Sequence, residues 1–266
     1  LQLHGQEAWG PLSSARRRAA EGAALITIVS RYTRHRFLGL ARVEPWRVRV
    51  LPNTFASRFS PGPKPEYLID RHGLRSKTVL LTVGRLNATE RGKGHDRVIA
   101  VLPTLAASRR DILYLIVGTG SDQVRLEALA RELGVAERVV FAGAVGSDEL
   151  PDYYRSADLF VMPSVQEGFG IVLLEAAASG LRVVAGNTDG SADALADGRL
   201  GRLVDPFDQD ALVDAIEQML AAGSPDAALV DRYSFARFAE QASQLFDEVL
   251  ASNQAAGERR AFLEAG

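Results

Sequence analysis

The sequence predicts an α/β fold: one complete, doubly wound parallel sheet joined to part of a second α/β domain. Three observations carry this prediction: 266 residues with 47% hydrophobic composition, apolar runs of strand length, and helical patterns between those runs. A chain of this length is expected to hold about two domains, or one large one. The apolar runs are nearly continuous, which is typical of parallel strands covered on both faces. Alternating strands and helices then predict an open sheet with right-handed crossovers.

The predicted elements follow in chain order. Strands are expected at 24–29, 48–51, 78–83, 112–117, 138–141, 159–162, 182–185 and 200–204. Helices are expected at 96–107, 122–133, 148–155, 170–179, 208–222 and 233–250. Gly134 directly follows the second of these helices, where a helix C-terminus favours glycine. Asp208 stands at the start of another, where a carboxylate can cap the first backbone N–H groups.

A cluster of prolines and glycine at 52–65 separates the two parts of the chain. We therefore divide the chain into a partial N-terminal domain (1–51), a linker (52–74), a complete α/β domain (75–231) and a C-terminal helical segment (232–266). The first part holds too few strands to form a stable sheet by itself. We expect it to be the end of a domain that begins before this chain.

The composition excludes several classes of protein. The chain has no cysteine, which excludes a disulfide scaffold, a cysteine-ligated zinc site and a thiol nucleophile. No apolar run approaches the roughly 18–20 residues of a membrane-spanning helix. The first residues also lack the basic start and apolar stretch of a signal peptide.

The net charge of −2 hides an uneven distribution, since residues 1–60 hold ten arginines and three acidic residues. This basic segment could contact nucleic acid or an anionic lipid surface, or it could be an ordinary solvated surface. No interleaved aromatic pattern supports binding to a single strand, and we expect no nucleic-acid partner.

In an open parallel sheet, ligands bind beyond the carboxyl ends of the strands. The loop after the strand at 78–83 reads GRLNATERGKGHD and carries two cations, Arg85 and Lys93, the second just before a helix. Two cations with flexible backbone and a helix N-terminus suit a diphosphate. The alternative is an ordinary basic surface loop. The sequence of a P-loop is absent.

Two further loops offer weaker signals. Gly118 and Gly120 follow the strand at 112–117, but Gln123 stands where a dinucleotide fingerprint has its third glycine, so we predict a tight turn close to a ligand. Gly143 and Val145 follow the strand at 138–141, in a run of small residues whose backbone groups could read the edge of a base.

The stretch PSVQEGFGIVLLEAAASG after the strand at 159–162 is the most informative. Glu167 stands in the loop, a Gly-Phe-Gly turn follows, and Glu175 lies inside an apolar helical run. Burying a carboxylate among apolar side chains is costly unless it is hydrogen-bonded, and a ribose diol would supply two donors. The alternative is that Glu175 pairs with an arginine and Glu167 is solvated.

Taken together, these motifs resemble the retaining, nucleotide-sugar-dependent GT-B glycosyltransferases of family 4. The resemblance rests on Gly84-Arg85, Lys93-Gly94, Glu167-Gly168-Phe169-Gly170 and Glu175, and it covers roughly residues 25–250. It implies a GT-B fold, in which the complete Rossmann-like domain binds the donor and the partial one belongs to the acceptor side.

The resemblance also implies roles for individual residues. Arg85 and Lys93 would hold the donor diphosphate, Glu167 would lie against the donor sugar, and these three would act in catalysis. Glu175 would bind the ribose, and the backbone around Gly143 and Val145 would contact the base. The donor-binding residues are then Gly84, Gly118, Gly120, Gly143, Val145, Gly168, Phe169, Gly170, Ile171, Val172 and Glu175.

Two features depart from the family pattern. The family's histidine near the donor sugar has no match among His4, His35, His72 and His95. The usual Gly-Gly after the sixth strand appears as Asp189-Gly190, which leaves the donor sugar unassigned.

The implied activity is transfer of a sugar, with retention, from a UDP- or GDP-sugar to a glycan, a lipid-linked or a small-molecule acceptor. The resemblance implies no cofactor and no metal. We expect a cytoplasmic protein, with possible peripheral contact at the inner face of the membrane through the arginine-rich segment. The alternative function is a non-catalytic module that binds the nucleotide sugar but lacks an acceptor domain.

Overall fold

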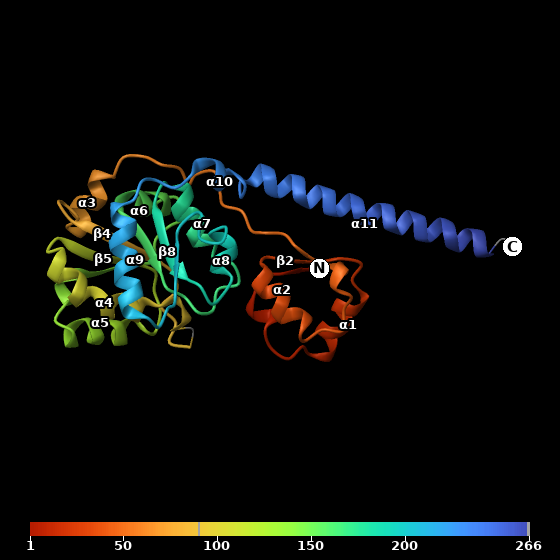
Figure 1. The fold of residues 1–266 in the computed structure, drawn as a ribbon, viewed down its shortest axis with the longest axis horizontal. Coiled ribbons are helices and arrows are strands. Elements are labelled where there is room, and N and C mark those ends of the chain that lie inside the picture. The colour runs from red at the N-terminus through yellow and green to blue at the C-terminus, as the bar shows by residue number, and fades with distance from the viewer. Residues whose placement is uncertain (90, 265–266) are drawn as a thin grey trace.

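The computed structural model describes residues 1–89 and 91–264 and shows two units joined by an extended segment (Figure 1). The larger unit is built on a six-stranded, fully parallel sheet with the strand order β6-β5-β4-β7-β8-β9. Its strands are β4 (Thr78–Val83), β5 (Ile112–Val117), β6 (Val139–Gly143), β7 (Leu159–Met162), β8 (Arg182–Gly186) and β9 (Arg202–Val204). The predicted doubly wound sheet is confirmed.

Helices cover both faces of this sheet. Their bounds are α3 (Glu66–His72), α4 (His95–Ser108), α5 (Gln123–Glu132), α6 (Leu150–Ser156), α7 (Ile171–Ala178), α8 (Ser191–Ala194), α9 (Gln209–Ala221) and α10 (Ala227–Asp231). Short 3-10 turns lie at η3 (Arg91–Lys93) and η4 (Ala136–Arg138). Because side chains alternate along a strand, Leu81 packs with α6, α7 and α10 on one face, whereas Leu80 packs with α4, α5 and α9 on the other. Both leucines are fully buried.

Most predicted bounds hold within two residues. The strands β4, β5 and β7 start and end where the apolar runs do. The last strand is shorter than predicted, because the N–H of Leu200 donates to Leu195 and closes a turn there instead of joining the sheet. Gly134 takes a φ of +68° after α5, and Asp208 accepts a hydrogen bond from the N–H of Ala211, as predicted.

The smaller unit is a three-stranded parallel sheet with the order β1-β2-β3. Its elements are β1 (Gln2–Leu3), η1 (Gln6–Ala8), α1 (Ser14–Gly22), β2 (Ile26–Ile28), α2 (Arg31–Leu38), η2 (Pro45–Arg47) and β3 (Val48–Val50). A separate core of Ile26, Ile28, Phe37 and Val48 holds it together. No sequence pattern predicts β1, because two residues are too few to show one.

The segment predicted as a linker is not free of structure. Helix α3 begins after Pro65 and ends at Gly73, and its Leu68 is fully buried in the core of the larger unit. The sequence does not predict this helix, because the prolines at 52–65 interrupt any helical pattern up to its first residue. Helices α8 and α10 also lie outside the predicted helices.

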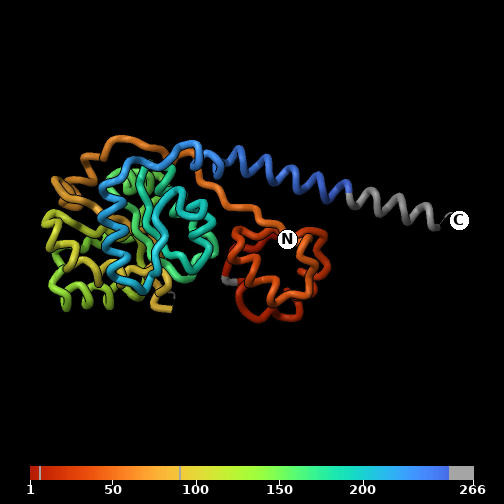
Figure 2. Tube along the Cα trace, viewed as in Figure 1, coloured from red at the N-terminus to blue at the C-terminus, as the bar shows by residue number. Residues whose placement is uncertain are grey.

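The two units face each other at the carboxyl ends of the large sheet. The Oγ of Ser30 donates to the carbonyl of Gly168 over 2.5 Å, and Arg31 pairs with Asp193 over 2.7 Å. The final helix α11 (Phe235–Glu264) leaves the larger unit and runs past the smaller one (Figure 2), where Glu248 pairs with Arg49 over 3.2 Å. None of the helices in the described part of the chain is long and apolar enough to cross a membrane.

Candidate functional site

A cavity of about 280 Å³ lies between the two units. The smaller unit lines it with His4, Gly5, Glu7 and Trp9. The larger unit lines it with Arg85, Gly92, Lys93, Gln166, Glu167 and Gly168. The structure therefore brings together the three residues predicted to act in catalysis, although they come from two different loops.

The loop between β4 and α4 carries Arg85 and Lys93. The loop that follows β5 packs so closely against the beginning of this loop that only glycine fits at two positions. A Cβ on Gly118 would lie 1.9 Å from the carbonyl oxygen of Gly84, and a Cβ on Gly120 would lie 2.1 Å from the carbonyl oxygen of Leu86. Gly118 also has a φ of +138°. These glycines form the predicted tight turn, and they bring the β5 loop against the strand end that precedes Arg85.

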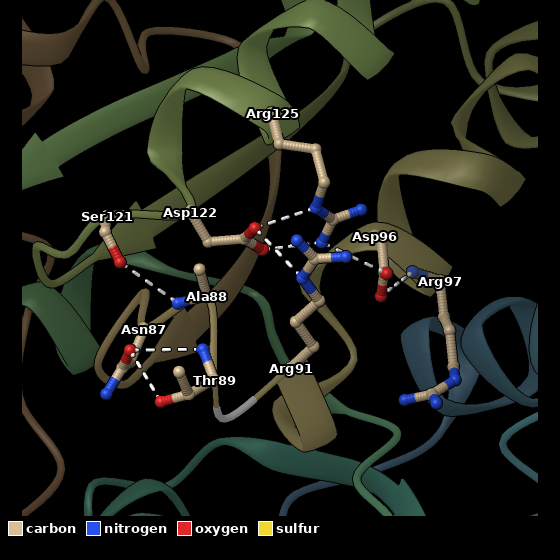
Figure 3. A network of polar contacts seen from close by, with 9 residues as sticks. All are labelled: Asn87, Ala88, Thr89, Arg91, Asp96, Arg97, Ser121, Asp122 and Arg125. Carbon is tan, nitrogen blue, oxygen red and sulfur yellow. Dashed lines mark hydrogen bonds and ion pairs between the residues drawn. The ribbon is translucent and has the colours of Figure 1, made fainter.

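A charged network supports the same loop from the side of α5 (Figure 3). Asp122 is 4% exposed and accepts hydrogen bonds from Arg125, the shorter at 2.5 Å, and it pairs with Arg91 over 3.2 Å. The Arg125 guanidinium, above all, holds the pKa of Asp122 below its usual value. Arg91 lies two residues before Lys93, so the network fixes the part of the loop that reaches the cavity.

Lys93 and Glu167 form an ion pair in the cavity wall. Glu167 is 8% exposed, which excludes the alternative that it is solvated. Burial raises the pKa of Glu167, and the neighbouring Lys93 opposes that rise. Arg85 also acts on the Glu167 carboxylate electrostatically. The charges at this site are therefore close enough to influence each other.

Asp189 holds the Glu167 loop in place through hydrogen bonds. Its carboxylate accepts hydrogen bonds from the N–H of Glu167 and the Oγ of Ser164, both at 2.8 Å, and from the N–H of Ser191 at 2.9 Å. Asp189 is 3% exposed, and burial raises its pKa. The residue that departs from the family's Gly-Gly pattern is thus a structural support of the site.

His4 lies in the cavity wall, although no sequence motif assigns it a role. It follows β1, and its carbonyl oxygen lies so near the larger unit that a Cβ on Gly168 would stand 2.1 Å from it. Glu7 holds this turn by accepting hydrogen bonds from the N–H groups of His4 and Gly5. Burial raises the pKa of Glu7, but these backbone bonds outweigh it and the net shift is downward.

The turn before α7 presents backbone rather than side chains. Phe169 is 2% exposed and packs against Tyr233, so its ring belongs to the core. Gly170 has a φ of +89° and caps α7, whose first residues are Ile171 and Val172. The first N–H groups of a helix have no partner within it, and they suit an anion.

Glu175 and the β6 loop lie outside the residues that line the cavity. The Glu175 carboxylate accepts a hydrogen bond from the hydroxyl of Tyr154 at 2.7 Å, and burial raises its pKa. Its hydrogen-bond partner is therefore a tyrosine, not the arginine of the alternative interpretation. The carbonyl of Gly143 accepts from the N–H of Gly118 at 2.8 Å, and Val145 packs against the core. The ribose and base roles of these residues remain predictions.

Comparison with known proteins shows which family the chain belongs to. The family model for the glycosyl transferases group 1 matches residues 68–234. A GDP-mannose-dependent alpha-(1-6)-phosphatidylinositol monomannoside mannosyltransferase of Mycolicibacterium smegmatis is 37% identical over 238 residues, which cover 85% of this chain and 62% of that protein. A D-inositol 3-phosphate glycosyltransferase 2 of Catenulispora acidiphila is 37% identical over 187 residues, covering 67% and 44% respectively.

Solved structures show the same fold. WaaG, a glycosyltransferase involved in lipopolysaccharide biosynthesis, matches with a TM-score of 0.66 and 30% identity over 79% of this chain and 58% of that chain. HepE of Anabaena, in complex with UDP and glucose, matches with a TM-score of 0.78 and 22% identity over 93% of this chain and 71% of that chain. The chain thus has the GT-B architecture, and it spans about three fifths of the first curated relative (62%). With the family model matching well over half of its residues, the chain belongs to the glycosyl transferases group 1 family.

Proposed function

We propose that this chain binds a nucleoside diphosphate sugar in the cavity between its units and transfers the sugar to an acceptor with retention of configuration. One observation carries this proposal: Arg85, Lys93 and Glu167 meet in one cavity at the carboxyl ends of β4 and β7. Ligands of open parallel sheets bind at this edge. Two cations at a cavity that also contains a carboxylate suit a diphosphate attached to a sugar.

In the proposed reaction the bond between the anomeric carbon and the diphosphate oxygen breaks, and the nucleoside diphosphate departs with the electron pair. The oxygen of an acceptor hydroxyl forms the new bond to the anomeric carbon on the same face, and its proton passes to the departing diphosphate. Arg85 and Lys93 neutralise the charge that grows on the leaving group, and the N-terminal amides of α7 add to this. We propose that no metal ion is needed, because these groups supply the positive charge. Glu167 faces the same space and lies against the sugar, where a carboxylate stabilises positive charge at the anomeric carbon.

The relatives favour GDP over UDP as the nucleotide. The printed name of the mycobacterial relative specifies a GDP-mannose donor, and that protein is 37% identical to this chain. The UDP complexes belong to a structure that is 22% identical, which supports the fold alone. We propose a GDP-sugar donor and an acceptor with an inositol or lipid headgroup, in line with the same name.

The Lys93→Ala variant tests the site directly. We expect its Kd for GDP to rise roughly 10- to 100-fold, because a hydrogen bond to a charged group is lost. Isothermal titration calorimetry measures this. Lys77→Ala is the matched control, since Lys77 is an exposed lysine on the larger unit outside the cavity. Equal affinities of the two variants would remove Lys93 from the donor site.

A second candidate function is donor binding without transfer. It is motivated by the match to only 62% of the length of the mycobacterial relative. Incubation with GDP-mannose and an acceptor with an inositol headgroup separates the two functions: continued release of GDP with mannosylation of the acceptor supports the transferase, whereas tight donor binding with no product supports the binding module.

We also propose that α1 contacts an anionic lipid surface. Several arginines of the basic segment already have partners, such as Arg31 with Asp193 and Arg47 with the carbonyls of Glu21 and Ala23. The consecutive Arg16, Arg17 and Arg18 of α1 are exposed instead, and among the described residues no acidic side chain pairs with them. Binding to anionic vesicles tests this proposal.

A further inference from the structure

One of the two cations proposed to hold the donor diphosphate, Lys93, already has a carboxylate partner in this structure. The ammonium of Lys93 pairs with the Oε1 of Glu167, and the two side chains are only 25% and 11% exposed. A pair so little exposed is weakly screened by water and salt. Lys93 is therefore held by a carboxylate of the protein at the place where the donor's phosphates are proposed to bind.

The backbone of Glu167 is fixed at both of its polar groups, which places its side chain at the cavity. Its N–H donates to the Oδ2 of Asp189 at 2.8 Å, and its carbonyl accepts from the N–H of Gly190 at 2.9 Å. Asp189 is itself held by Ser164 and Ser191. A Cβ on Gly190 would lie 2.1 Å from the carbonyl oxygen of Gly168, so the β8–α8 turn is packed directly against the Glu167 loop.

A carboxylate and a phosphate in the same buried space compete for one ammonium. Lysine offers three donors, but two anions at close range repel each other strongly where water is excluded. Binding of the diphosphate to Lys93 must therefore weaken or break the pair with Glu167, and the cost of breaking it lowers the observed affinity.

We propose that Glu167, held in place by Asp189, competes with the donor diphosphate for Lys93, so that the donor binds only by displacing this internal carboxylate. This inference rests on the proposed function and deepens it. It assigns Asp189 as a positioning residue that acts through Glu167. It also predicts that removing the negative charge of Glu167 improves nucleotide binding, even though Glu167 faces the reacting sugar.

The test is a double-mutant cycle on the full chain, with GDP as the ligand and calorimetry as the readout. The four proteins are the wild type, Glu167→Gln, Lys93→Ala and the double variant. We expect Glu167→Gln to lower the Kd about tenfold in the wild-type background, and by less than about threefold when Lys93 is absent. A competition for Lys93 requires this difference, because Glu167→Gln frees an ammonium only where one is present.

Two further variants test the role of side-chain length and provide a control outside the cavity. Glu167→Asp keeps the charge but shortens the side chain, and it should lower the Kd by a smaller factor than Glu167→Gln. Glu217→Gln is the matched control: it breaks an ion pair with Arg109 at 2.8 Å, outside the cavity, and should leave the Kd unchanged. Thermal unfolding of each variant establishes that it is folded before titration.

The outcomes separate the inference from the function on which it rests. Glu167→Gln that binds GDP no more tightly than wild type overturns the inference. An equal gain with and without Lys93 also overturns it, because general charge repulsion would then explain the effect. A wild-type chain that binds neither GDP nor UDP overturns the proposed function itself, and this inference with it.

Discussion

His95 is a buried histidine two residues after Lys93, which is proposed to bind the phosphates. It is the first residue of α4, it is 6% exposed, and its Nε2 has no hydrogen-bond partner among the described residues. Burial, helped by the nearby Lys93, lowers its pKa to about 4 from the ordinary value of 6.5. The imidazole is therefore neutral in the folded protein at neutral pH.

This shift makes stability depend on pH. Below pH 6.5 the unfolded chain takes up a proton at His95 that the folded chain binds only near pH 4, so stability falls as the pH drops between these values. Between pH 7.5 and 5 we expect the wild type to lose about 2 kcal/mol more than His95→Gln. Urea unfolding at the two pH values measures the difference. Equal losses in both proteins would show that His95 is not buried in its neutral form.

At the scale of single elements, the contribution of the basic helix α1 to membrane binding can be tested separately from the cavity. Each basic residue near an anionic membrane contributes about 1 kcal/mol, so replacing Arg16, Arg17 and Arg18 with Gln should weaken vesicle binding about 100-fold. Co-sedimentation with phosphatidylglycerol vesicles at low and high salt measures this, and the wild-type binding should fall with salt.

The matched control replaces three exposed arginines of the larger unit, Arg131, Arg199 and Arg202, with Gln. It changes the net charge by the same amount and should bind vesicles like the wild type. If both triple variants lose affinity equally, net charge alone drives binding and α1 is not a specific surface. If the wild type does not bind anionic vesicles, the proposal is wrong and the arginines of α1 form an ordinary solvated surface.

The strands that could be predicted from the sequence are those that are both long and buried. All six residues of β5 are buried, and β4 is buried from Val79 onward, whereas β1 has two residues and shows no pattern. Helix α3 was hidden because its first turn follows a proline cluster. Local patterns therefore predict the sheet well, but they miss short elements that only tertiary packing stabilises.

The site could be predicted only in part, and for a related reason. The sequence predicts ligand-binding loops where strands end and helices begin. Three site residues lie in such loops: Arg85, Lys93 and Glu167. His4 and Asp189 reach the site through contacts that are not local: His4 from the other unit, and Asp189 through the backbone of a residue 22 positions away. A histidine after a two-residue strand and a buried carboxylate carry no local signal of such contacts.

At the scale of the whole molecule, the cavity exists only because two units meet. Four of its lining residues come from the smaller unit and six from the larger one. Ser30 of the smaller unit contacts the carbonyl of Gly168, next to Glu167, and Arg31 pairs with Asp193 of α8, so the smaller unit is attached directly to the loops that carry the site. A ligand that bridges the units is expected to stabilise both together.

The melting temperature of the wild-type chain reports whether the cleft between the two units recognises a nucleoside diphosphate. A ligand at about 100 times its Kd stabilises the folded protein by about 2.7 kcal/mol. We therefore predict that millimolar GDP raises the melting temperature by several degrees, about 2–4 °C for a 1 kcal/mol gain in a protein of this size, while guanosine, which lacks the diphosphate, does not. An unchanged melting temperature with GDP, or an equal rise with guanosine, would show that the cleft does not recognise the diphosphate.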